Sequence, residues 1–89
     1  MFTCTIDFSK CSDYEELYDI IYKALEVPDW CGHNLSALWD VLTGFIDPPT
    51  KITMKGIDSL SKELKLEVQD MLKIFDRAKE DGIDYKIEK

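Results

Sequence analysis

The sequence predicts a single α/β domain, over residues 1–89, in which a three-stranded parallel sheet is packed by three to four helices. Three short segments, at residues 2–8, 50–55 and 83–87, alternate apolar with polar positions, as strands with one buried face do. Segments with helical spacing of apolar residues lie between each strand and the next. Because helices separate the strands in the order β-α-α-β-α-β, the strands are expected to be parallel, with right-handed crossovers.

The first strand and the first helix are predicted from local signals. The run from Phe2 to Phe8 is rich in β-branched residues, which favour a strand. Ser12 and Glu15 are expected to open the helix as a capping box, in which each side chain satisfies a free backbone N–H. Pro28 is expected to end it, because a proline disfavours helical geometry at the residue before it. The predicted buried stripe is Tyr14, Leu17, Tyr18, Ile21 and Leu25.

A second helix is predicted between Asn34 and Gly44. Asparagine is a favoured N-cap, and glycine suits the position just beyond a helix end. This arrangement leaves Ser36 and Asp40 one turn apart on the more exposed side of the helix. The buried stripe is expected to contain Leu35, Leu38, Trp39, Leu42 and Phe45.

The second half of the chain is predicted to contain a strand, a long helix and a final strand. Gly56 ends the strand over residues 50–55, and Asp58 is expected to cap a short helical turn. The long helix that follows is expected to kink near Lys65 and to end at Gly82, which suits a left-handed cap. Its predicted buried positions are Leu64, Val68, Met71, Leu72, Phe75 and Ala78.

The composition narrows the range of partners. The chain has 18 acidic and 11 basic residues and a formal net charge of −7, so nucleic acid and anionic membranes would be repelled. A basic protein is the natural partner of such a surface. Cys4, Cys11 and Cys31 are odd in number, and no leader precedes them, which indicates free thiols in a reducing cytoplasm. No apolar run approaches the roughly 20 residues of a membrane span.

The window from Val27 to Pro48 is acidic, aromatic and without lysine or arginine. It holds both tryptophans and the only histidine, and no lysine or arginine occurs between Lys23 and Lys51. Asp40 therefore has no cation near it in the sequence. One interpretation of Asp40 is a solvated carboxylate opposite the buried stripe of its helix. The other is an interface charge beside an aromatic anchor, placed to meet another protein.

Signals for catalysis or for a bound cofactor are weak in this chain. Cys31 and His33 form a thiol and imidazole pair in the sequence, but no third orienting group or oxyanion site accompanies them. One histidine and three scattered cysteines lack the paired spacing of metal ligands. The sequence contains no phosphate loop, dinucleotide fingerprint or nucleophile elbow. No catalytic residue, metal or cofactor is therefore expected.

The segment from Pro28 to Gly44, PDWCGHNLSALWDVLTG, closely resembles the signature of the barstar family, the intracellular inhibitors of secreted bacterial ribonucleases. The resemblance continues through Phe75-Asp-Arg-Ala-Lys79 to Gly82 and is weaker before Leu25. It implies a three-stranded parallel sheet packed by helices, which agrees with the element order above. It also implies an inhibitor rather than an enzyme.

Carried over residue by residue, the resemblance implies a partner-binding face. Asp40 would enter the ribonuclease active site in place of the substrate phosphate, and Trp30 would pack on a catalytic imidazole. Gly32 and Asn34 match loop positions that let the backbone come close to the partner. The implied partner-binding residues are Trp30, Gly32, His33, Asn34, Ser36, Asp40, Thr43, Gly44, Phe45, Asp47, Arg77 and Asp81.

Three positions depart from the family pattern. Ser36, His33 and Arg77 stand where the best-known family member has acidic residues, whereas Asp81 keeps an acidic position late in the chain. Contacts to a basic enzyme would be lost or reversed at these positions. Such changes act as specificity devices, so the partner is expected to be a different ribonuclease or a related toxin.

The predicted function is that of a cytoplasmic bacterial inhibitor that blocks the active site of a cognate basic, extracellular ribonuclease. The first alternative is an acidic interaction or immunity domain of the same fold that binds another kind of protein. A basic partner without a phosphate site, and indifferent to Asp40→Ala, would favour that alternative. The second alternative, a small thiol enzyme, requires Cys31 to be reactive at neutral pH.

Overall fold

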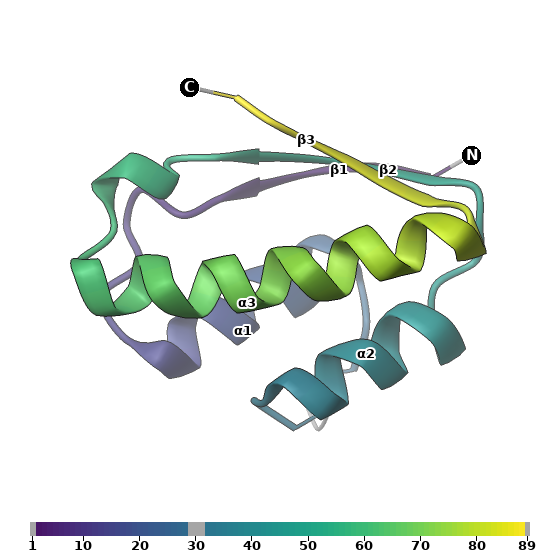
Figure 1. The fold of residues 1–89 in the computed structure, drawn as a ribbon, viewed down its shortest axis with the longest axis horizontal. Coiled ribbons are helices and arrows are strands. Elements are labelled where there is room, and N and C mark those ends of the chain that lie inside the picture. The colour runs from purple at the N-terminus through teal and green to yellow at the C-terminus, as the bar shows by residue number, and fades with distance from the viewer. Residues whose placement is uncertain (1, 29–31, 89) are drawn as a thin grey trace.

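The structure is a computed structural model that describes residues 2–28 and 32–88 of the chain. Its elements alternate strands with helices along the chain, and short 3-10 turns flank the longest helix (Figure 1). The strands are β1 (Phe2–Asp7), β2 (Thr50–Lys55) and β3 (Ile83–Ile87). The helices are α1 (Tyr14–Ala24), α2 (Leu35–Gly44) and α3 (Lys62–Ala78), and the 3-10 turns are η1 (Ile57–Ser59) and η2 (Lys79–Asp81).

The three strands form one parallel sheet in the order β1-β2-β3. Phe2 lies opposite Thr50, and Thr50 lies opposite Ile83, so the strands begin at the same edge of the sheet. The chain crosses from β1 to β2 through α1 and α2, and from β2 to β3 through α3. The predicted α/β fold with a three-stranded parallel sheet and three helices is confirmed.

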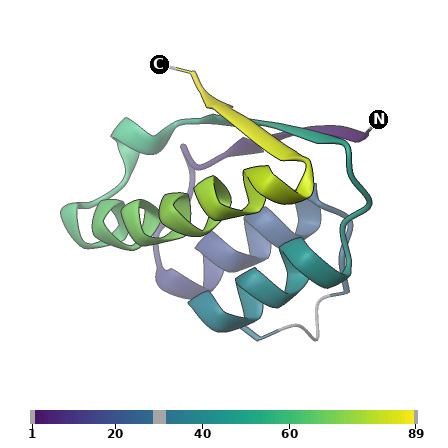
Figure 2. The same cartoon turned by 45° about the vertical axis from the view of Figure 1, so that its right-hand side comes forward.

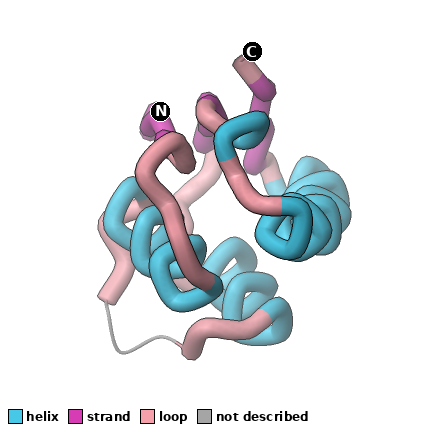
Figure 3. Tube along the Cα trace, turned by 90° about the vertical axis from the view of Figure 1, so that its left-hand side faces the viewer, coloured by secondary structure: helices cyan, strands magenta, loops and turns pink. Residues whose placement is uncertain are grey.

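The helices all lie on one side of the sheet (Figures 1 and 3). α1 contacts β1 and α3 contacts β3, whereas α2 packs chiefly against α3. Figure 2 shows α2 as the helix farthest from the strands. Because α2 forms the outermost layer, one of its long sides is available to a partner. Within the described residues, no helix is both long and apolar enough to span a bilayer.

The core lies between the sheet and the helices, and it corrects two sequence-based assignments in α1. Tyr14 opens the helix and is 50% exposed, whereas Tyr22 is buried. The buried stripe therefore runs from Leu17 toward the end of the helix, where α1 lies under the sheet. The largest fully buried side chains are Tyr18, Tyr22, Phe8, Phe75, Ile6, Leu17, Ile21, Leu38, Leu42, Ile52, Met54 and Met71.

The start of α1 is capped by Asp13, not by Ser12 as the sequence predicted. The Asp13 carboxylate accepts a hydrogen bond from the backbone N–H of Glu16 at 2.9 Å. The hydroxyl of Ser12 instead donates to the Glu16 carboxylate at 2.5 Å. Both residue types are good N-caps, so the composition of this turn did not decide between them.

α1 ends at Ala24, before the stop expected at Pro28. Glu26 takes a left-handed backbone with φ of 58°, and its N–H bonds to the carbonyl of Lys23. The N–H of Val27 bonds to the carbonyl of Tyr22. These two bonds form a Schellman motif, which satisfies carbonyls at the helix end without the usual glycine.

α3 begins at Lys62 and has no break near Lys65, so the kink expected there is wrong. Ser61 caps it by accepting from the N–H of Leu64 at 3.4 Å, and the helix then runs unbroken past Lys65 to Ala78. The preceding turn η1 follows Gly56 and has no side-chain cap, so the role predicted for Asp58 is wrong.

Two glycines predicted to end helices differ in conformation. Gly82 has a φ of 89°, and a Cβ there would lie 2.7 Å from the Cβ of Pro48. Gly44 is instead the last residue of α2, its φ is not positive, and a Cβ added there would have no other atom within 4 Å. The left-handed cap expected at Gly82 is confirmed, and the cap expected at Gly44 is wrong.

This difference predicts opposite effects for the same substitution. Gly82→Ala is expected to lower the free energy of unfolding by at least 1–2 kcal/mol, roughly the cost of a left-handed backbone for a residue with a Cβ. Gly44→Ala is expected to raise it by up to about 1 kcal/mol, because alanine favours a helix and meets no obstacle there. Urea unfolding of both variants tests this, and effects of the same sign would contradict the assignment.

Candidate partner-binding site

The outward side of α2 is set by the cap at its start. Asn34 has an extended backbone with φ of −153°, and its side-chain oxygen accepts from the N–H of Ala37 at 2.8 Å. The cap predicted at Asn34 is confirmed. It fixes the first turn, so that Leu38 points into the core while Ser36 and Asp40 stay exposed.

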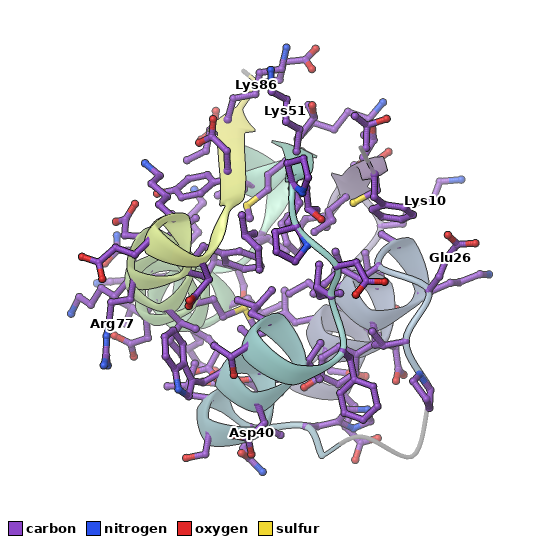
Figure 4. All side chains as sticks on the ribbon, turned by 90° about the vertical axis from the view of Figure 1, so that its right-hand side faces the viewer. Lys10, Glu26, Asp40, Lys51, Arg77 and Lys86 are labelled. Atoms are coloured by element: carbon purple, nitrogen blue, oxygen red, sulfur yellow. The ribbon has the colours of Figure 1, made fainter. Side chains whose placement is uncertain are left out.

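Asp40 lies on the outer side of α2, away from the sheet (Figure 4). Within the described part of the chain, no lysine, arginine or histidine forms an ion pair with it. It also makes no side-chain hydrogen bond there. The structure therefore presents an exposed carboxylate whose charge is not neutralised by its own chain.

A shallow groove between α2 and α3 contains Asp40. Its volume is about 410 Å³, and one wall comes from each helix. The guanidinium carbon of Arg77 lies 4.8 Å from the centroid of the Trp39 ring, as in a cation–π contact. The groove thus combines an anion, a cation and an aromatic face. Its lining residues are Leu35, Ser36, Trp39, Asp40, Ile74 and Arg77.

Trp39 is therefore not the core residue that helical spacing predicted. It is half-buried: its side chain packs against the core, and the guanidinium of Arg77 lies over its ring. The buried side chains of α2 are Leu38, Val41 and Leu42, so the buried stripe includes Val41 in place of Trp39. Phe45 was also expected in the buried stripe but is 47% exposed.

The loop before α2 is held against α1 by His33. The His33 Nε2 atom lies 3.0 Å from the Asp19 carboxylate. Its ring stacks beside Tyr18 and Tyr22, with ring centroids 6.0 and 6.1 Å away. The hydroxyl of Tyr22 also donates to the carbonyl of Gly32 at 2.7 Å. These contacts position the loop residues next to α2, and none of them was predicted from the sequence.

Gly32 lies at a close approach between the loop and α2. A Cβ at this position would lie 3.2 Å from the amide nitrogen of Asn34 and 3.3 Å from the Cβ of Ala37. A residue with a Cβ would therefore require Asn34 and Ala37 to shift by a few tenths of an ångström. Trp30 and Cys31, which the sequence singled out, lie outside the described residues.

The other predicted site residues lie around the end of α2 and at η2. Thr43 is exposed, and its hydroxyl donates to the carbonyl of Trp39 at 2.8 Å. Phe45 and Asp47 line a second hollow, on the side of the chain that contains Leu25. Asp81 is exposed in η2 and does not line the groove. The structure thus brings Ser36, Asp40 and Arg77 into one groove and leaves Asp47 and Asp81 outside it.

Metal-ligand geometry is not present in the part of the chain that the structure describes. No group of three or more histidine, cysteine, aspartate or glutamate side chains there could hold a metal ion. Cys4 packs against the core, and its burial raises the pKa of the thiol. A raised pKa lowers the fraction of reactive thiolate at neutral pH, which makes Cys4 a poor nucleophile.

Comparison with known proteins places this geometry in a family. Residues 1–88 match the family model described as Barstar (barnase inhibitor). The chain belongs to the barstar family. The protein named "Putative ribonuclease inhibitor YrdF", from Bacillus subtilis (strain 168), is 34% identical over 76 residues, which is 85% of this chain and 84% of that protein. The resemblance in the segment from Pro28 to Gly44 is confirmed. This barstar-family chain is a ribonuclease inhibitor and not an enzyme.

Proposed function

We propose that this barstar-family protein blocks the active site of a cognate basic, barnase-like ribonuclease by placing Asp40 in its phosphate-binding site. The observation that carries the proposal is the state of Asp40. It is exposed on the outermost helix, and no described cation of its own chain is paired with it. An exposed, unneutralised carboxylate is free to take the place of a phosphate oxygen among the cations of a ribonuclease.

The energetics favour a cationic site as the partner of Asp40. Burying an unpaired carboxylate in an interface is unfavourable, because water that solvated the charge is removed. Several hydrogen-bonding cations in a phosphate site can offset that loss. A neutral or acidic surface cannot do so, so the face around Asp40 selects against such surfaces.

The charge of the whole chain favours rapid association with such an enzyme. The formal net charge is −7, and the long-range field of an acidic protein steers a basic partner toward it. We further propose that the inhibitor acts in the cytoplasm. There it would protect the cell's own RNA from a ribonuclease that normally acts outside the cell. In this sense the protein would serve as immunity against a toxin.

Inhibition of a panel of basic microbial ribonucleases, including barnase, tests the proposal. We expect the wild-type chain to inhibit at least one of them. We also expect the association rate to fall as the salt concentration rises from about 20 mM to about 500 mM. Salt screens the attraction between exposed charges that are farther apart than the Debye length, which is roughly 10 Å at 0.1 M and roughly 3 Å at 1 M. Binding of a basic protein without ribonuclease activity, at a rate and strength that Asp40→Ala leaves unchanged, would instead support an interaction domain of the same fold.

A further inference from the structure

Arg77 is an exposed cation on α3, and no carboxylate in the described part of the chain forms an ion pair with it. It lines the same groove as Asp40, yet the two side chains do not form an ion pair. Its described contact is with the ring of Trp39, where the guanidinium carbon lies 4.8 Å from the centroid. The groove therefore presents two separate, unpaired charges of opposite sign.

The carboxylate of Asp76, the residue before Arg77 in α3, is bound by other groups. Asp76 accepts a hydrogen bond from the Tyr85 hydroxyl at 2.6 Å and lies 3.4 Å from the ammonium of Lys79. The hydrogen bond from Tyr85 and the nearby Lys79 lower the pKa of Asp76, so this carboxylate stays ionised and bound to these two residues. Asp81, four residues beyond Arg77, forms no ion pair with it.

Trp39 holds Arg77 in a state that suits recognition of a carboxylate. A guanidinium held over an aromatic ring by a cation–π contact does not use its N–H groups on a hydrogen-bond acceptor, so they stay free to donate. Those N–H groups match the two oxygens of a carboxylate, and a bidentate pair of this kind is stronger than a neutral hydrogen bond. The contact with Trp39 also restricts the Arg77 side chain before binding, which lowers the entropy lost when a partner binds.

We propose that the groove between α2 and α3 is a two-charge recognition site, in which Arg77 binds a carboxylate side chain of the same ribonuclease whose cations bind Asp40. The inference rests on the proposed function and specifies, in addition, how charges are arranged on the partner's surface. The cognate enzyme carries an acidic residue beside its cationic phosphate site. Enzymes with a cation at that position are disfavoured, because two like charges would meet in the interface.

The probe that tests this is barnase, used as the parent enzyme and as a set of variants in which each lysine or arginine is changed singly to glutamate. Dissociation constants are measured against wild type, Arg77→Glu and Lys51→Glu. The last two change the net charge equally, but Lys51 lies in β2 on the sheet, away from the groove (Figure 4). A double-mutant cycle then separates local pairing from long-range steering.

We expect at least one charge-reversed barnase to bind the wild-type chain about ten-fold or more tightly than the parent enzyme does, because close charge pairs are strongly coupled. That gain should vanish with Arg77→Glu and persist with Lys51→Glu. The neutral variant Arg77→Gln should fall between wild type and Arg77→Glu.

The inference is overturned if every barnase variant responds equally to wild type and to Arg77→Glu while Asp40→Ala still abolishes inhibition. In that outcome the proposed function stands. If neither the parent enzyme nor any variant binds any form of the chain, both the proposed function and this inference fail. Circular dichroism of Arg77→Glu confirms that the exposed substitution leaves the fold intact.

Discussion

Leu38→Ala is expected to lower the free energy of unfolding by about 2–5 kcal/mol, the range found for leucine truncated in a packed core. Leu38 is fully buried and belongs to α2, the helix that carries Asp40. Its truncation leaves a cavity under the outermost helix, and α2 chiefly contacts one other element, α3. The loss should therefore loosen the helix that presents the site as well as the whole fold.

Leu66→Ala is the matched control, because it removes the same atoms from a leucine that is 55% exposed on α3. We expect its effect to lie within about 0.5 kcal/mol of zero, as is usual for surface substitutions. Equilibrium unfolding in urea, followed by far-ultraviolet circular dichroism, measures both variants. Similar losses for the two would show that the packing of α2 is not as described.

Asp40→Ala is expected to weaken binding of the cognate ribonuclease by about 2–5 kcal/mol, or roughly 30-fold to several thousand-fold. The partner's phosphate site would be left buried with unpaired cations, which is the main part of such a loss. The isosteric Asp40→Asn should lose most of the same affinity, since it keeps the shape and removes the charge.

The folded state provides the control for this prediction. Asp40 is exposed and unpaired among the described residues, so Asp40→Ala should change the free energy of unfolding by less than about 0.5 kcal/mol. Asp58→Ala removes an exposed carboxylate from η1, which does not line the groove, and should leave affinity nearly unchanged. Titration calorimetry with the same enzyme compares the variants, and an equal loss for both would argue for steering alone.

The strands were predictable from the sequence because their signal is local. Residues 50–55 alternate strictly, and the structure places β2 over the same residues, with Ile52 and Met54 buried and Lys51 exposed. A strand with one covered face needs only this period of two. The parallel order followed from the helices between the strands, so the fold class required no information about side-chain contacts.

Caps and partial burial were harder to predict, because adjacent residues compete for them. Ser12 and Asp13 are both suitable N-caps, and only the geometry of the turn selects Asp13. Trp39 has the spacing of a core residue, but Arg77, far away in sequence, stacks on its ring. Spacing along one helix carries no information about a residue supplied by another.

The candidate site was predictable only in part for the same reason. The face with Ser36 and Asp40 followed from the Asn34 cap and the helical period, and both residues are exposed. The anchoring of His33 by Asp19 and two tyrosines of α1 left no local signal, because Asp19 lies outside the predicted buried stripe of the first helix. Long-range contacts of this kind decide how the loop is held.

The mode of inhibition tests the central claim most directly. Initial rates of the inhibited ribonuclease are measured over a range of dinucleotide substrate concentrations, with and without a saturating mononucleotide that occupies the phosphate site. If Asp40 takes the place of the substrate phosphate, the inhibition is competitive, and the mononucleotide slows formation of the complex. Inhibition that leaves the apparent affinity for substrate unchanged, or a complex that forms equally well on the occupied enzyme, would contradict this account.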